Sequence, residues 1–386
     1  MSLVRPYRYV KKRDVALDML KLVSMLFIAI SHCLQRWGSA TYVNGLGFSI
    51  FYSVSLAMFF FAGGMLIKKC SNVKDLGTYI VKTLITYLVP AYLFTCLSIW
   101  TLPRFTLSEK PFDYWMNELY LRTDTFYWFF LVAAFINIFI AIIYYVTTLV
   151  KIKTLWMDIL KAVFMIGASI GYLMVFLFIY NQPDLGPGSL SANMVLYYMP
   201  IALLAFLFTI FKSYFAKLRH IKIYAFLLFL GFLSAYITLL LRYADWLPGL
   251  RGDFWEITGH AVCSLCGVVS YLYVFKLLEK YRFFDHISNL GSYSGPYYLV
   301  HVYIVRLFAT YITRGDINDS AYGAFVAFLT ICFVLGSLIV TMFLCIIPYT
   351  DLLLFANLRR IKDIIHPKKW VLREIHHFTS GKANDA

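Results

Sequence analysis

A lysine and a histidine share one apolar stretch near the start of the chain, residues 18–33, which reads DMLKLVSMLFIAISHC. Lys21 and His32 are eleven residues apart, so a helix would present both side chains on one face, about 16 Å apart along its axis. Asp18 lies one turn before Lys21 and can pair with it. Ionisable groups are costly in hydrocarbon, so this pattern indicates a polar site inside a membrane. Its chemistry would combine a cation that binds an anion with an imidazole that takes up a proton near neutral pH.

A purely structural explanation of the same residues is the alternative. Lys21 would then extend to the inner headgroups with Asp18 as its partner, and His32 would hydrogen-bond a neighbouring helix. The alignment of the two side chains on one face, together with a second polar segment, favours the chemical explanation.

The second polar segment, residues 290–301, reads LGSYSGPYYLVH. Its glycines and its proline predict an irregular start to a helix, and His301 follows the proline by five residues. The segment also contributes hydroxyl groups, from Ser292, Tyr293, Ser294, Tyr297 and Tyr298. Two intramembrane histidines, a lysine and these hydroxyls predict a polar interior built for a reaction.

Helices that cross a membrane must position these residues. Of the 386 residues, 61% are hydrophobic and 14% are charged, and the mean hydropathy is +0.72. This composition leaves too little polar surface for a soluble globule, so we predict an all-α polytopic membrane protein. Apolar runs near the roughly 20 residues that span a bilayer as a helix number ten, at residues 15–37, 47–67, 79–100, 126–150, 157–180, 193–212, 221–242, 257–276, 293–313 and 321–347.

The net charge of +15 reports topology. If the N-terminus is cytosolic, the lysines and arginines gather in the inside segments, at residues 5–13, 68–74, 151–153, 212–222, 276–282 and 359–382. This is the positive-inside distribution, so we predict that both termini are cytosolic. The charge then indicates anionic headgroups rather than nucleic acid as the partner. We divide the chain into a basic cytosolic segment (1–14), a ten-helix membrane domain (15–347) and a basic tail (348–386) on the inner leaflet.

Cysteine usage indicates neither a disulfide framework nor a metal site. Six of the seven cysteines lie in or near apolar spans. Cys263 and Cys266 form a CxxC, but it lies inside a predicted span and has no second pair, so we interpret it as small packing residues. We therefore predict no metal and no bound cofactor.

The polar segments resemble motifs of the membrane acyltransferase-3 family. The segment LDMLKLVSMLFIAISH is similar to the family's first span, where an Asp, a basic residue and, after ten more residues, a His correspond to Asp18, Lys21 and His32. The segment FFFAGGMLIKK resembles the end of its second span, with Gly63 where Ser is usual and Gly64 at the family's glycine.

Three further segments extend the resemblance along the chain. The segment YIVKTLITYLVPAY resembles the start of the family's third span, with Lys82 in place of a frequent Arg and Pro90 as the proline. The segment YWFFLVAAF is similar to its Trp-Phe-Leu segment. The segment LGSYSGPYYLVH resembles its Gly, Ser-Tyr, Tyr-Leu, His segment, with Gly295 in place of the usual Tyr and with matches at Gly291, Ser294, Tyr298, Leu299 and His301.

The resemblance implies transfer of an acyl group, usually acetyl, from cytosolic acyl-CoA to a hydroxyl of a cell-envelope glycan. Lys21 and Lys82 would contact the anionic donor, and Asp18 would orient Lys21. His32 would be the general base, and His301 would position a substrate or join proton transfer. We expect support from Ser294, Tyr298, Gly63 and Gly64.

The implied partners are acyl-CoA as co-substrate, a lipid-linked or nascent glycan, membrane lipids and, where the acceptor does not reach the membrane core, a separate extracytoplasmic transferase. The implied location is the plasma or inner membrane. The alternative is a polysaccharide exporter or a proton-coupled secondary transporter, in which the histidines would relay protons. Such carriers usually place carboxylates in mid-membrane, and here the acids of the spans lie near predicted ends, at Asp14, Asp18, Asp158, Glu256 and Asp351.

Overall fold

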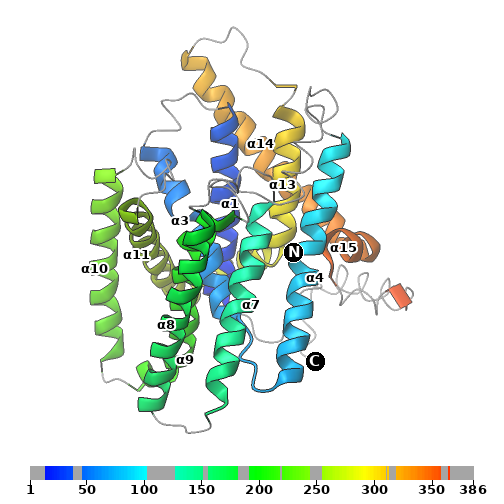
Figure 1. Ribbon diagram of the computed structural model, residues 1–386. Helices are drawn as coiled ribbons and strands as arrows, with labels where there is room; N and C mark the ends of the chain where they lie inside the picture. The colour runs from blue at the N-terminus through cyan, green and yellow to red at the C-terminus, as the bar shows by residue number, and fades with distance from the viewer. Residues whose placement is uncertain are drawn as a thin grey trace.

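The computed structural model describes the backbone of residues 14–37, 46–101, 127–150, 155–180, 191–217, 220–243, 254–309, 311–312, 319–357 and 364–365. Within these ranges the chain forms helices and no strand, so the protein is an all-α polytopic membrane protein (Figure 1). The long helices are α1 (Val15–Trp37), α3 (Leu46–Leu66), α4 (Val73–Thr101), α7 (Trp128–Thr148), α8 (Leu155–Tyr180), α9 (Ala192–Phe215), α10 (Ile221–Tyr243), α11 (Phe254–Leu278), α13 (Ser294–Ala309) and α14 (Asp319–Ile346).

Nine of the described helices are long and apolar enough to cross a membrane. The span predicted at 293–313 is the exception, because its helix α13 has 16 residues and stops at Ala309 within the described chain. It is preceded by the short helix α12 (Arg282–Ser288) and a 3-10 turn, η3 (Asn289–Tyr293). The irregular start predicted from the glycines and the proline is therefore correct, since the 3-10 turn leads directly into α13. Most of the basic tail lies outside the described residues.

Helix α1 is the centre of the assembly. It packs against α3, α11, α13, α14 and the 3-10 turn. Of the residues in its most apolar stretch, 61% are buried inside the protein. Helix α10 lies at the edge (Figure 1) and packs mainly on α11. Only 11% of the residues in its most apolar stretch are buried. The helix that carries Lys21 and His32 is thus surrounded by other helices, as an intramembrane site requires.

Two glycines allow the backbones around the site to approach closely. A Cβ atom at Gly64 of α3 would collide with the backbone of Ala202 in α9, and one at Gly291 would collide with the backbone of Asp18 in α1. Small residues at helix interfaces are the usual means of close packing in membranes. Gly64 therefore allows α3 and α9 to pack closely, and Gly291 allows η3, which leads into α13, to pack closely against α1.

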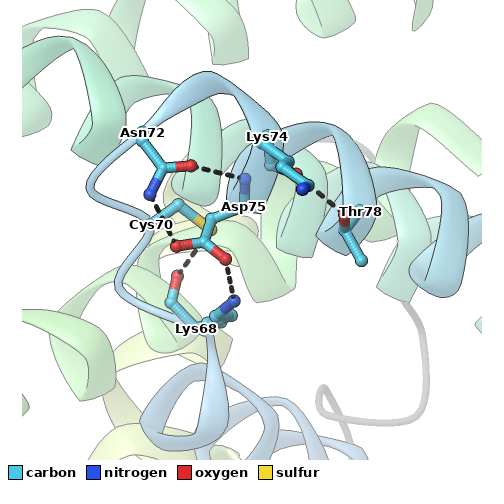
Figure 2. Close-up of polar contacts among 6 residues, drawn as sticks. All are labelled: Lys68, Cys70, Asn72, Lys74, Asp75 and Thr78. Atoms are coloured by element: carbon cyan, nitrogen blue, oxygen red, sulfur yellow. Dashed lines mark hydrogen bonds and ion pairs between the residues drawn. The ribbon is translucent and has the colours of Figure 1, made fainter.

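A polar cluster fixes the turn between α3 and α4 (Figure 2). Asn72 caps α4, since its Oδ1 accepts a hydrogen bond from the backbone N–H of Asp75 at 2.8 Å. Asp75 in turn accepts hydrogen bonds from the Asn72 amide at 2.9 Å and from Lys68 Nζ at 2.8 Å. Lys69 Nζ donates to the Thr209 carbonyl of α9 at 2.9 Å. These contacts hold the end of α3 beside the start of α4.

Candidate active site

The structure brings the two predicted histidines together. His32 Nδ1 on α1 lies 3.2 Å from His301 Nε2 on α13. The two imidazole rings are stacked, with centroids 5.2 Å apart and planes 19° apart. His301 is buried and His32 is half-buried. Residues 269 positions apart in sequence thus form one hydrogen-bonded pair inside the helix assembly.

Hydrogen bonding assigns the tautomers of this pair. His301 Nδ1 lies 2.9 Å from the backbone carbonyl oxygen of Tyr297, and a carbonyl oxygen only accepts, so Nδ1 carries the proton. In neutral His301 the other nitrogen, Nε2, is then an acceptor. Its partner, His32 Nδ1, must donate to it. His32 Nε2 is left with an unprotonated lone pair, which is the state a general base requires.

Aromatic side chains form a layer beside the histidine pair. The ring of Tyr298, which is buried, lies 6.5 Å from the His32 ring and 5.4 Å from the His301 ring, measured between centroids. The Tyr298 ring also packs against the rings of Phe129 and Phe130, at centroid distances of 4.8 Å and 5.6 Å. Tyr298 therefore lies between the two imidazoles and the phenyl rings of α7.

Beyond this aromatic layer lies a cavity of about 240 Å³. Its wall combines Lys21 of α1 with residues of α3, α4, α7, η3, α13 and α15 (Pro348–Phe355). This volume far exceeds the roughly 10–15 Å³ that one water molecule requires. The lining residues are Lys21, Phe59, Gly63, Leu66, Tyr79, Thr86, Tyr87, Pro90, Phe129, Phe130, Asn137, Ser292, Ser294, Gly295, Pro296, Leu299 and Phe355.

The lysine of the cavity is held by a buried carboxylate. Lys21 Nζ and Asp18 Oδ1 are 2.7 Å apart, one helical turn along α1. Asp18 is 6% exposed, so its charge is kept inside the protein, where a neighbouring cation compensates it. The pair fixes a positive charge on the cavity wall. Of the predicted supporting residues, Gly63 and Ser294 also line the cavity, whereas Tyr298 belongs to the aromatic layer.

Lys82 is not brought into the cavity. Its side chain is exposed, although Tyr79, Thr86 and Pro90 of the same helix all line the cavity. Lys82 lies three residues after Tyr79 and four before Thr86, so it belongs to the same stripe of α4. The structure therefore places Lys82 beside the cavity wall and Lys21 on it.

Asn137 of α7 is a cavity residue that the sequence reasoning missed. It is 7% exposed, its Nδ2 donates to the Ala133 carbonyl at 2.7 Å, and its side chain shares a hydrogen bond with Tyr87. A single amide within the apolar run VAAFINIFIAII was the signal that could have identified it.

His260 of α11 was missed as well. This third histidine of the spans is 4% exposed and packs edge-on against the Tyr197 ring at 5.1 Å. It does not line the Lys21 cavity. Its position inside the span predicted at 257–276 was the available signal.

Comparison with known proteins agrees with the helical architecture and the polar site. The model of the acyltransferase-3 family, which describes an acyltransferase domain, matches residues 14–350. The chain therefore belongs to this family, and the protein is a multi-pass membrane acyltransferase. Neither the curated proteins nor the solved structures contain a significant match.

Proposed function

We propose that this protein is an O-acyltransferase that moves an acyl group, acetyl in the simplest case, from cytosolic acyl-CoA to a hydroxyl of a cell-envelope or exported polysaccharide. The observation that carries the proposal is the hydrogen-bonded pair of His32 and His301, separated by one aromatic layer from a cavity with Lys21 on its wall. A base and an anion-binding cation are the two groups that this reaction needs.

The donor uses the cationic side of the site. Acyl-CoA carries phosphates, and Lys21 offers a fixed positive charge that Asp18 orients. Lys82, exposed on the adjoining stripe of α4, adds a second charge where the donor approaches. The cytosolic orientation of this side follows from the positive-inside distribution of the chain.

The acceptor hydroxyl is activated by the histidine pair. His32 Nε2 takes the hydroxyl proton while the oxygen attacks the thioester carbonyl carbon. A new C–O bond forms, the C–S bond breaks, and the leaving thiolate of CoA receives the proton from His32. His301 acts as a positioning residue, because its hydrogen bond to His32 Nδ1 keeps Nε2 available.

The acceptor is a lipid-linked or nascent glycan that reaches the membrane core, or a carrier from which a separate extracytoplasmic transferase completes the transfer. Either route places the protein in the plasma or inner membrane. The reaction requires acyl-CoA as co-substrate and uses only side chains of the chain for its acid–base steps.

Isotope transfer in membrane vesicles tests this function. Inverted vesicles that contain the protein receive acetyl-CoA labelled in the acetyl group, and the label in the polysaccharide is measured. We expect ester-linked label with the native protein and background label with His32→Gln at equal protein content. Equal label in both vesicles, or export of polysaccharide without any ester, would contradict the proposal.

A further inference from the structure

An apolar groove of about 660 Å³ runs along α4 beside α15. From Leu93 to Trp100 it covers seven residues of α4, which is about 10 Å along the helix axis. Because one helix supplies nearly all of its wall, the groove suits a single apolar chain. The lining residues are Leu93, Phe94, Cys96, Leu97, Ile99 and Trp100 of α4 and Leu354 of α15.

This groove adjoins the cavity of the active site. Phe94 lines the groove, and Phe355 lines the cavity. The two rings are stacked, with centroids 6.0 Å apart and planes 19° apart. A chain bound in the groove would therefore lie next to the cavity, on the far side of this ring pair.

Polar groups lie at the end of the groove. Thr101 follows Trp100, and its Oγ1 lies 2.8 Å from the hydroxyl oxygen of Tyr303 on α13. Trp100 is 85% exposed, and exposed tryptophans are typical of the membrane–water interface. With the N-terminus in the cytosol, as the charge distribution predicts, this end of α4 faces outside. A lipid in the groove would thus bring its headgroup to Thr101 and Tyr303.

A cation lies close to this polar end. Arg306 is half-buried and follows Tyr303 by one turn of α13, so the two residues are neighbours on the helix surface. Arg306 also interacts electrostatically with His32 and with Tyr298. Lys21 precedes His32 by eleven residues, toward the opposite end of α1. The histidine pair therefore has Lys21 on its cytosolic side and Arg306 on its outer side.

We propose that these residues bind the acceptor as a single-chain lipid phosphate, with the chain in the α4 groove and the phosphate at Arg306. This inference rests on the proposed function and selects the lipid-linked acceptor. A guanidinium binds phosphate through two parallel hydrogen bonds, and a charge at membrane depth requires such a function. The apolar groove and the arginine match the two ends of the lipid. A glycan joined to that phosphate would then lie beside His32.

Photolabelling tests where the chain binds. The full-length protein in phosphatidylcholine nanodiscs is irradiated with farnesyl diphosphate that carries a benzophenone, and labelled peptides are identified by mass spectrometry. We expect label at residues 93–100 that unlabelled farnesyl diphosphate removes. Cys96→Trp fills the groove and should lower this label at least tenfold. Cys332→Trp is the control, because Cys332 of α14 is also exposed but does not line the groove.

The phosphate site is tested by binding measurements on Arg306 variants. Arg306→Gln should weaken farnesyl diphosphate binding about 10- to 100-fold, the value of a charge-assisted hydrogen bond. It should leave the binding of farnesol, which has the chain and no phosphate, unchanged. Arg306→Lys keeps the charge and should recover part of the affinity. The control is Arg282→Gln, which removes an exposed cation at the start of α12.

The outcomes separate the acceptor site from the function. If the native protein transfers acetyl groups but dioleoyl phosphatidylglycerol competes for the label as well as farnesyl diphosphate does, the groove holds bulk lipid and the proposed site is wrong. Label outside residues 93–100, or native affinity for farnesyl diphosphate in Arg306→Gln, also refutes it. If the native protein neither binds acetyl-CoA nor transfers its acyl group, the proposed function itself is refuted.

Discussion

His32 is hydrogen-bonded to His301, and this contact decides which ring nitrogen of His32 carries the proton. The sequence placed both histidines in spans, and it identified Lys21 and Asp18 as a pair, which the structure places 2.7 Å apart. It did not reveal that His32 is hydrogen-bonded to His301, because these two residues lie 269 positions apart in the sequence. Nor did it reveal that the Tyr297 carbonyl fixes the tautomer of His301. Side-chain pairing across helices has no local sequence signature.

His32→Gln should lower acyl transfer about 10²–10⁴-fold, the usual effect of losing a general base. Glutamine can hydrogen-bond as histidine does but takes up no proton near neutral pH. The rate is measured with labelled acetyl-CoA, and the Kd of acetyl-CoA, which should not change, serves as the control. Near-normal transfer by His32→Gln would favour the structural alternative, in which Lys21 extends to the headgroups and His32 only hydrogen-bonds a neighbouring helix.

His301→Leu should lower the transfer rate at least tenfold by removing the acceptor for His32 Nδ1–H. The two tautomers of His32 would then become comparable in population, and ¹⁵N chemical shifts of labelled His32 would report the change. His301→Gln restores an acceptor oxygen and should recover part of the rate. Unaltered ¹⁵N shifts in His301→Leu would refute the positioning role.

Lys21→Ala should weaken acetyl-CoA binding about 10- to 100-fold, the value of a charge-assisted hydrogen bond to a phosphate. Lys21→Arg keeps the charge and should bind within a fewfold of the native protein. Isothermal titration of the protein in nanodiscs measures both. Native affinity in Lys21→Ala would remove Lys21 from the donor site.

At the scale of elements, hydropathy predicted where the spans lie, but it did not predict which helices pack together. Nine predicted spans coincide with helices of full length, because a run of about 20 apolar residues is a direct consequence of bilayer thickness. The tenth, α13, starts at Ser294, close to the predicted start at 293, but within the described chain it stops at Ala309, before the predicted end at 313. Which helices touch, as α3 and α9 do at Gly64, depends on close approaches that hydropathy does not encode.

Gly64→Ala and Gly63→Ala should differ although the glycines are neighbours. The added Cβ at Gly64 meets the Ala202 backbone, so α3 and α9 must separate, at a cost of about 1–3 kcal/mol typical of overpacking. The added Cβ at Gly63 meets nothing within 4 Å. Melting temperatures of the two variants in detergent measure the difference, and equal values would contradict the close contact.

At the scale of the whole molecule, the charge distribution predicts which side is cytosolic. Reporters fused before Met1 or after Ala386 that require the cytosol should both be active, because lysines and arginines are retained on the inside. The control is an insertion after Gly186, in the segment without basic residues, which should be active only outside. A C-terminal reporter active only outside the cytosol would overturn this orientation.

The aromatic layer of Tyr298, Phe129 and Phe130 has an electrical consequence for a living cell. It lies between the donor cavity and the histidine pair, so in the proposed reaction the thioester reaches His32 only when these rings move aside, and at other times the rings restrict the water molecules along which protons would pass. A membrane holds a voltage worth about 2.3 kcal/mol per charge for every 100 mV. By keeping its two sides electrically insulated between turnovers, the protein can work across the membrane without discharging it.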